Sequence, residues 1–328
     1  MRTWFLVAAT GLAATHSLRA QDGGSSLATA AEFSLEVLPG PNTGEAALPR
    51  PPLPLPLGAE PEDETPVVNG GAVHFSLGID LSSAYFYRGL RIEDDGLIAQ
   101  PWATVGVDLV NNDTWTLQAI AGSWNSWHDE ETDAGTEDGT LAAWYESDIY
   151  FGLTAATGNW ELGAQYGWFV SPSDAFTTVE ELQFSVSYDD SECLEDFALA
   201  PSAMVIIETG EGTSDGFGKG VYAQVAIEPS LALNEEETLN LSFPVIVGVS
   251  ASDYYEHDDG EGGAGDDDFF GFASIGATLA FDLPVSGRYG AWSCYVGVNA
   301  QLMGDLGTEY NDDDDTALVA SVGVSVEY

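Results

Sequence analysis

Basic residues are scarce in this chain of 328 residues, which has 7 Lys and Arg against 54 Asp and Glu and a formal net charge of -47. A nucleic-acid-binding protein needs a basic patch to neutralise phosphates, so this charge excludes one. The 2 cysteines are too few for a disulfide-stapled scaffold or a four-cysteine zinc module. A disordered acidic chain is excluded as well, because 45% of the residues are hydrophobic and provide surface to bury.

Long apolar runs are also missing once the N-terminus is set aside. A membrane-spanning helix needs roughly 18 or more consecutive apolar residues, so a helical membrane protein is excluded. The strands of a membrane barrel hide their hydrophobicity in alternation, so a barrel is not excluded.

The N-terminus has the three parts of a secretory signal peptide. Arg2 supplies the positive charge, residues 4–15 form a short apolar core, and Ala20 precedes the expected cleavage site. The alternative is an amphipathic first helix of the mature fold. We predict a signal peptide over residues 1–20, with no lipid anchor because no cysteine lies at the cleavage site.

Residues 21–70 contain nine of the fifteen prolines. Proline lacks a backbone donor and favours extended geometry, so this stretch cannot join a helix or a sheet. We predict a disordered, Pro-rich periplasmic tether ahead of one folded domain at 71–328. A recognition segment for a periplasmic partner is the alternative, and whether the tether enters the lumen stays open.

From residue 72 the hydrophobic pattern has a period of two. Successive side chains of a strand point to opposite faces, so each run presents one apolar face and one polar or small face. The weakest run contains Pro201. Twelve such runs are expected, near 73–82, 97–110, 114–124, 143–154, 159–169, 179–189, 197–207, 217–228, 238–250, 269–282, 291–302 and 318–328.

Three features favour a barrel over a soluble sandwich. Short turns at 111–113 and 157–159 alternate with long acidic connections at 124–142 and 251–268, as in outer-membrane barrels. The second face is too polar for a dry core, which suits a hydrated lumen. Aromatic residues gather at the short-turn ends of the apolar faces, as in a membrane girdle: Phe75, Trp115, Phe151, Trp160, Tyr188, Phe281, Trp292 and Tyr328.

The stretch Ser82-Ser83-Ala84-Tyr85-Phe86-Tyr87-Arg88-Gly89-Leu90 resembles the opening motif of the TorF-type family of bacterial putative porins. The likeness continues through Gln100-Pro101, Gly106-Val107-Asp108, Ala121-Gly122-Ser123-Trp124 and Glu146-Ser147-Asp148-Ile149-Tyr150, and it fades after about residue 190. The resemblance implies an outer-membrane barrel and suggests a role in transport.

Candidate constriction residues are the cations that follow the first strand and the carboxylates of the polar face. In porins such charges set the field that orients solutes and tunes selectivity. Alternatively, Arg88 is an internal strut that pairs with Glu146, Asp148 or Glu161, because a buried charge needs a partner. The predicted set is Arg88, Arg91, Asp80, Glu146, Asp148, Glu161 and Glu181.

The remaining acidic runs, histidines and cysteines form no recognisable catalytic or metal-binding motif. Acidic runs at 129–138, 257–268 and 312–315 could attract divalent cations, yet they lack calcium-loop spacing and are read as a solvated surface. No nucleophile elbow and no paired His-x-x-x-His motif accompanies the histidines, so we predict no enzyme, no cofactor and no resident metal. Cys193 and Cys294 could pair or remain separate thiols.

The sequence therefore predicts an all-β, transmembrane, antiparallel up-and-down barrel of about twelve strands in the outer membrane. Its partners are outer-membrane lipid, lipopolysaccharide and small hydrophilic solutes; the oligomeric state stays open. The expected function is porin-like passive diffusion with a preference for cations. Alternatives are a non-conducting barrel with adhesive or structural acidic loops, and a soluble secreted β-sandwich that binds a ligand.

Overall fold

The computed structural model describes seven stretches: residues 72–112, 114–129, 143–194, 198–236, 238–261, 263–285 and 289–328. The predicted signal peptide at 1–20, the tether at 21–70, the acidic residues 130–138 and Arg288 lie outside the described residues.

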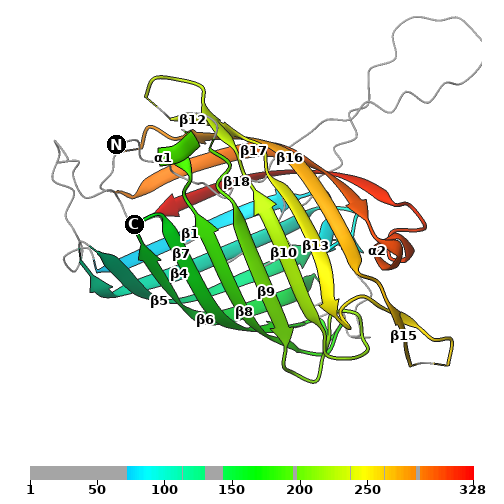
Figure 1. The fold of residues 1–328 in the computed structure, drawn as a ribbon. Coiled ribbons are helices and arrows are strands. Elements are labelled where there is room, and N and C mark those ends of the chain that lie inside the picture. Colours follow the sequence, from blue (N-terminus) through cyan, green and yellow to red (C-terminus); the bar gives the residue numbers. More distant parts are fainter. Residues whose placement is uncertain are drawn as a thin grey trace, which may run out of the picture.

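A closed ring of twelve antiparallel strands forms the molecule (Figure 1). Each strand pairs with its neighbours in chain order, and the ring closes where β1 pairs with β18. The predicted all-β, up-and-down barrel is confirmed, and the alternative prediction of a soluble sandwich with two stacked sheets is wrong. The ring consists of β1 Val73–Ser82, β4 Ile98–Asn111, β5 Trp115–His128, β6 Trp144–Thr157, β7 Trp160–Val170, β8 Val179–Tyr188, β9 Ser202–Glu208, β10 Val221–Ile227, β13 Val245–Ser252, β16 Phe270–Asp282, β17 Ala291–Met303 and β18 Thr316–Glu327.

Proline interrupts one of the predicted runs and directly follows the end of another. The run at 238–250 is two strands, β12 Leu239–Ser242 and β13, separated at Pro244. Its neighbour β10 continues past Pro229 as β11 Ser230–Ala232, which pairs with β12. Proline has no N–H for the ladder, so a strand that contains one breaks or bends there. The bend leaves the pairing order of the barrel unchanged.

The outer face of the barrel is apolar and exposed. Val225 in the middle of β10 is 59% exposed, and Ile275 in the middle of β16 is 61% exposed. Their neighbours in the sequence point into the barrel, because side chains alternate between the faces of a strand. In water so large an apolar surface would be unfavourable. Among the described residues no helix is long and apolar enough to cross a membrane.

The two ends of the barrel differ in their connections. At the short-turn end, which holds the C-terminus, β4 and β5 join through 112–114 and β6 and β7 through 158–159. The connection 189–201, with α1 Ser191–Leu194, is longer than the sequence pattern indicates for this end. The opposite, long-loop end carries five small elements: β2 Tyr85–Tyr87, β3 Leu90–Glu93, β14 Glu256–Asp258, β15 Ala264–Asp267 and α2 Asp305–Glu309.

Candidate lumen site

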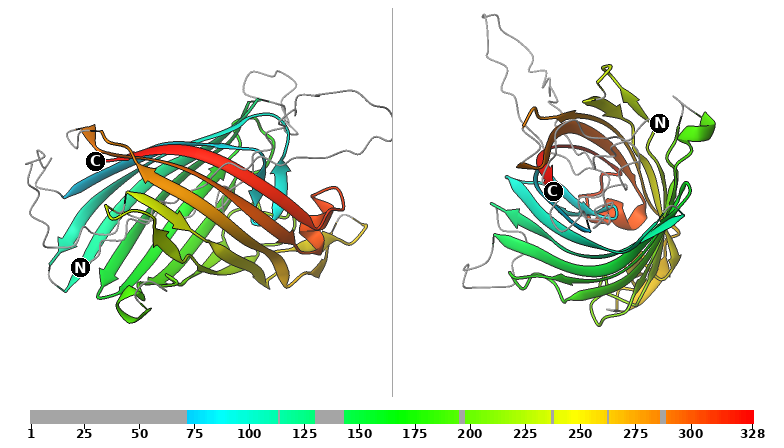
Figure 2. Two further views of the ribbon diagram at one scale, coloured as in Figure 1. Left: turned by 90° about the horizontal axis from the view of Figure 1, so that it is seen from above. Right: turned by 90° about the vertical axis from the view of Figure 1, so that its left-hand side faces the viewer.

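The β2–β3 hairpin after the first strand folds into the barrel instead of extending outward. Tyr85, Phe86, Tyr87 and Arg88 are all buried, and Arg88 keeps only 2% of its surface. Viewed along the barrel, the hairpin lies inside the ring of strands (Figure 2). The lumen at the long-loop end is therefore occupied by the chain itself.

The turn of this hairpin depends on two residues with positive φ, Arg88 at 49° and Gly89 at 86°. Such a backbone is costly for any residue except glycine, so the surrounding contacts must hold Arg88 in place. A Cβ on Gly89 would lie 2.7 Å from Cβ of Phe272, which leaves no space for a side chain. Glycine thus allows the hairpin to press against β16.

Arg88 and Glu181 form a bidentate ion pair across the lumen. Nη1 donates to Oε1 at 2.6 Å and Nη2 donates to Oε2 at 2.7 Å. The guanidinium also donates to the hydroxyl of Tyr254 and lies 4.6 Å from the ring centre of Tyr87. Burial works to lower the pKa of Arg88, but the Glu181 carboxylate outweighs it and the net pKa is raised. Arg88 therefore stays charged and paired in the interior.

A second polar contact ties the hairpin to β6. The Tyr85 hydroxyl donates to Oε2 of Glu146 at 2.6 Å, and its ring packs on Trp124 with centroids 5.6 Å apart. Burial, and then the charges of Glu146 and Asp148, raise the pKa of Tyr85 well above its ordinary value. The phenol remains a neutral donor, which suits an acidic wall.

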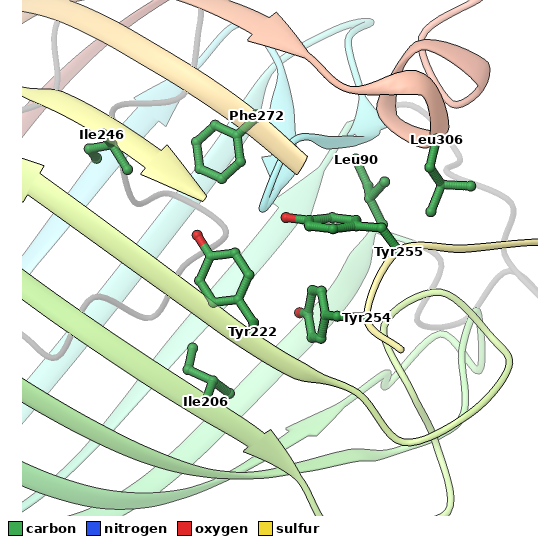
Figure 3. Close-up of a cluster of buried hydrophobic side chains, with 8 residues drawn as sticks. All are labelled: Leu90, Ile206, Tyr222, Ile246, Tyr254, Tyr255, Phe272 and Leu306. Carbon is green, nitrogen blue, oxygen red and sulfur yellow. The ribbon is translucent and has the colours of Figure 1, made fainter. Parts of the chain in front are cut away.

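Aromatic side chains close the space around the hairpin on its other side. Tyr254 and Tyr255 reach inward from the connection after β13 and meet Tyr222 and Phe272 (Figure 3). The Tyr255 hydroxyl donates to the carbonyl of Arg88 at 2.8 Å. The Asp267 carboxylate accepts from the backbone N–H groups of both tyrosines, which fixes their positions.

Along β7 and β8, burial of the inward positions falls toward the short-turn end, whereas on β17 the inward Tyr295 and Ser293 stay buried close to that end. On β7, Gln165 and Phe169 are buried, whereas Glu161 near the short-turn end is partly exposed. On β8, Glu181 is buried and Ser187 is partly exposed. The hairpin thus closes the lumen at the long-loop end, and at the short-turn end the inner face of β7 and β8 is more exposed.

The structure brings together four of the seven predicted constriction residues: Arg88, Glu146, Asp148 and Glu181. Arg88 pairs with Glu181, not with Glu161 as the strut alternative also allowed. Arg91 lies at the outer rim, paired with Asp94 and with the exposed Asp312 at 2.9 Å each.

Asp80 and Glu161 lie elsewhere on the inner wall. Asp80 interacts with Trp102 beside Gln100. Glu161 pairs in register with Ser187 toward the short-turn end. The constriction role of all seven residues stays a prediction.

Tyr85, Tyr87, Tyr254 and Tyr255 are site residues that the sequence analysis did not single out for a role. The first two fall inside residues 82–90, the stretch that resembles the opening motif of the TorF-type family, which was the available signal. Tyr254 and Tyr255 stand in an acidic connection, and nothing local indicates that they turn inward. Only the fold reveals them.

The acidic connections organise their own backbone. The Asp259 carboxylate accepts from the N–H groups of Glu261 and Gly263, and Asp258 accepts from that of Gly260. Within the described stretches, no group of three or more His, Cys, Asp and Glu side chains is placed to hold a metal ion. Cys193 and Cys294 are both free thiols.

No protein-family model and no curated protein matches this sequence. The resemblance to the TorF-type family therefore remains a prediction from the motifs quoted above.

Solved outer-membrane barrels have a similar architecture at low identity. An outer membrane channel from Pseudomonas putida F1 matches with a TM-score of 0.45 and 11% identity, over 78% of this chain and 94% of that chain. The NanC porin matches with a TM-score of 0.39 and 11% identity, over 76% and 98%. The transport unit of the autotransporter AIDA-I from Escherichia coli matches with a TM-score of 0.38 and 13% identity, over 83% and 93%. At these identities the likeness concerns the barrel architecture alone.

Proposed function

We propose that this protein is an outer-membrane, porin-like channel for passive diffusion of small hydrophilic solutes, with a preference for cations. The proposal rests on the distribution of side chains, which is the opposite of that in a soluble protein: the outer surface is apolar and the interior is polar. Apolar side chains such as Val225 and Ile275 face outward, while amides and carboxylates face inward. Such a surface is stable in lipid and such an interior is stable in water.

The membrane placement follows from the two ends. Trp115, Trp160 and Tyr328 are exposed near the short-turn end, where a girdle of rings prefers the lipid headgroups. This end would face the periplasm and the long-loop end the outside, where lipid and lipopolysaccharide are the neighbours. The motif at residues 82–90 supports the same assignment through its resemblance to the TorF-type porins.

The preference for cations rests on the charges of the inner wall. Glu146, Asp148 and Glu181 are matched within the lumen cluster by the single cation Arg88. A low-dielectric wall concentrates the field of the excess carboxylates, which attracts cations and repels small anions.

The β2–β3 hairpin would regulate passage. It fills the long-loop end of the lumen, so solutes pass only when it shifts toward the outside. The hairpin is attached to the wall through side chains rather than through a sheet ladder: Arg88 pairs with Glu181, Tyr85 donates to Glu146, and the apolar side chains of the hairpin pack on the wall. Contacts of this kind can break locally while the barrel remains intact.

The same hairpin favours a second candidate, a non-conducting barrel whose acidic external loops serve adhesion or surface stability. In that case the hairpin is a permanent plug, and its buried ion pair and aromatic packing serve stability alone. The two candidates differ in one measurable property, conductance.

Single-channel recording of the refolded protein in planar bilayers separates the candidates. The channel predicts discrete conductance steps in KCl, larger and longer when residues 84–92 are replaced by a short Gly-Ser linker. Shortening the β14–β15 tip at 259–261 is the matched control and should leave the conductance unchanged. Silence of both the wild type and the linker variant, with folded barrels, would establish the non-conducting candidate.

A further inference from the structure

The chain that follows β13 turns inward and lies against the tip of the β2–β3 hairpin. We call residues 253–256 the strap. Tyr254 and Tyr255 of the strap are each 1% exposed and belong to the buried cluster that includes Leu90 of the hairpin (Figure 3). The Tyr255 hydroxyl donates to the carbonyl of Arg88 at 2.8 Å, and the Arg88 guanidinium donates to the Tyr254 hydroxyl. The strap therefore holds both the backbone and the side chain at the hairpin tip.

One carboxylate, that of Asp267 on β15, fixes the strap. Its Oδ1 accepts from the backbone N–H groups of Tyr254 at 3.2 Å and Tyr255 at 3.0 Å. Its Oδ2 accepts from the N–H group of Asp253 at 3.0 Å and from the hydroxyl of Ser250 at 2.8 Å. Asp253 has a φ of 48°, a conformation that a residue other than glycine adopts only where its surroundings impose it. The four hydrogen bonds to Asp267 thus stabilise the turn that sends the strap inward.

The strap is also bonded to the connection at 209–220, between β9 and β10. The N–H group of Glu256 donates to Oδ2 of Asp215 at 3.0 Å, and the Tyr254 hydroxyl donates to Oγ of Ser214 at 2.8 Å. Hydrogen bonds therefore join the hairpin tip, the strap and this connection at the long-loop end of the barrel.

These shared contacts couple the movement of the hairpin to that of the strap. Arg88 is bonded at once to Glu181 on the wall and to Tyr254 and Tyr255 on the strap. The hairpin tip cannot leave the wall unless the bonds to both tyrosines break or the strap moves with it. Contacts that share residues are not independent, and segments joined in this way open as one cooperative unit.

We propose that Asp267 is a positioning residue for the closed lumen: it holds the strap against Arg88, so that the strap and the β2–β3 hairpin leave the lumen together. The inference rests on the proposed function, because it names what regulates the passage that the hairpin closes. Asp267 is itself exposed on β15. A residue in contact with solvent thus controls a contact inside the barrel.

Hydrogen exchange of the full chain, refolded in detergent, tests the coupling without any conductance. Asp267→Ala removes all four hydrogen bonds, so exchange at residues 84–92 and 253–256 should rise by about tenfold in both segments, with β6 still protected. Asp267→Asn keeps one acceptor oxygen and should restore part of the protection. Asp266→Ala removes the neighbouring exposed carboxylate of β15 and is the matched control, which should exchange like the wild type. A rise at 253–256 alone would overturn the proposal.

A double-mutant cycle tests the route from the strap to the hairpin. Tyr255→Phe removes the hydroxyl that binds the Arg88 carbonyl and keeps the ring. Alone, it should raise exchange at residues 84–92 by about fivefold. In the Asp267→Ala background it should add little, because the strap is already released. Equal effects in both backgrounds would mean that the hairpin opens independently of the strap, which also overturns the proposal.

Single-channel records distinguish the strap from the channel. In a conducting barrel, Asp267→Ala should raise the open probability and Asp266→Ala should not. Coupled exchange in a barrel that never conducts supports the role of Asp267 and overturns the channel. A conducting wild type, with open probability and exchange at 84–92 unchanged in Asp267→Ala, overturns the role of Asp267 and leaves the channel.

Discussion

Arg88 and Glu181 are 93 residues apart in the sequence and form a bidentate ion pair inside the barrel, 2.6 Å between Nη1 and Oε1. The pair joins the tip of an inward hairpin to the wall strand β8. Both side chains are fully removed from solvent. A buried charge is strongly unfavourable without a partner of opposite sign, so neither side chain could be buried without the other. The ion pair therefore helps to hold the β2–β3 hairpin in the position where it closes the lumen.

Breaking this ion pair should release the hairpin. Arg88→Met leaves the Glu181 carboxylate buried and unpaired, which costs about 3–5 kcal/mol. We expect a higher open probability in single-channel records and faster proteolysis of residues 84–93, with the barrel still folded. The double variant Arg88→Met, Glu181→Met removes both charges and should restore much of the closed state. A double variant as open as Arg88→Met alone would contradict this reading.

Gly89→Ala should destabilise the hairpin through two effects, the positive φ and the contact with Phe272. The expected cost is about 1–3 kcal/mol in the closed state. Gly158→Ala is the matched control, because Gly158 also has a positive φ but no atom within 4 Å of the added Cβ. The difference between the two variants in the free energy of unfolding measures the contact with Phe272 beyond the cost of the positive φ, and equal values would argue against the contact.

The attachment of the β14–β15 hairpin to α2 should depend on pH through His257. Its Nε2 lies 2.7 Å from Asp268 Oδ2 and its Nδ1 lies 3.4 Å from Glu309 Oε1. The hydrogen bond to Asp268 and the nearby charges raise the pKa of His257 above its ordinary 6.5. The stabilisation is therefore complete below about pH 6.5 and is lost as the pH rises through the raised pKa.

Hydrogen exchange at residues 256–268 and 305–309, corrected for intrinsic rates, measures this effect. Exchange should increase from pH 6 to pH 9 in the wild type and stay high at all pH values in His257→Asn. The control His74→Asn changes a histidine at the short-turn end and should behave like the wild type. A flat profile in the wild type would rule out the His257 contact as the cause.

A charge on the outer face should disturb insertion into lipid. Val225→Arg places a guanidinium at an exposed position in the middle of β10, which costs about 2–4 kcal/mol if the position faces the bilayer core. Leu233→Arg lies in the turn between β11 and β12, is similarly exposed and should cost much less. Urea unfolding from lipid vesicles gives both values, and equal costs would contradict the lipid-facing assignment.

Much of the fold was predictable because strand alternation is a local property. The runs expected at 97–110 and 143–154 correspond to Ile98–Asn111 and Trp144–Thr157. The boundaries were less predictable around proline: the run at 197–207 begins only at Ser202, after Pro201, and Pro244 divides another run. Each proline removes one backbone N–H and so one hydrogen bond between strands. The alternation of apolar and polar residues, read over about ten residues, does not show where that single bond is lost.

The site was predictable only in part. Arg88, Glu146, Asp148 and Glu181 were selected because they carry charge on the inner face of expected strands, and that face follows from alternation. Arg91 was grouped with Arg88 by proximity in sequence, but a turn at Gly89 sends it to the rim, where it pairs with Asp312. The direction of a connection depends on distant packing partners.

The sequence by itself determined the strand number, the lipid-facing residues and the acidic lumen, because these depend on period, composition and charge. The tertiary structure decided that the first connection turns inward, that Arg88 meets Glu181, and that the chain itself closes one end of the lumen. The physical reason is range. Alternation is set between neighbouring residues, whereas the closure of the lumen depends on contacts between residues that only the curved, closed sheet brings together.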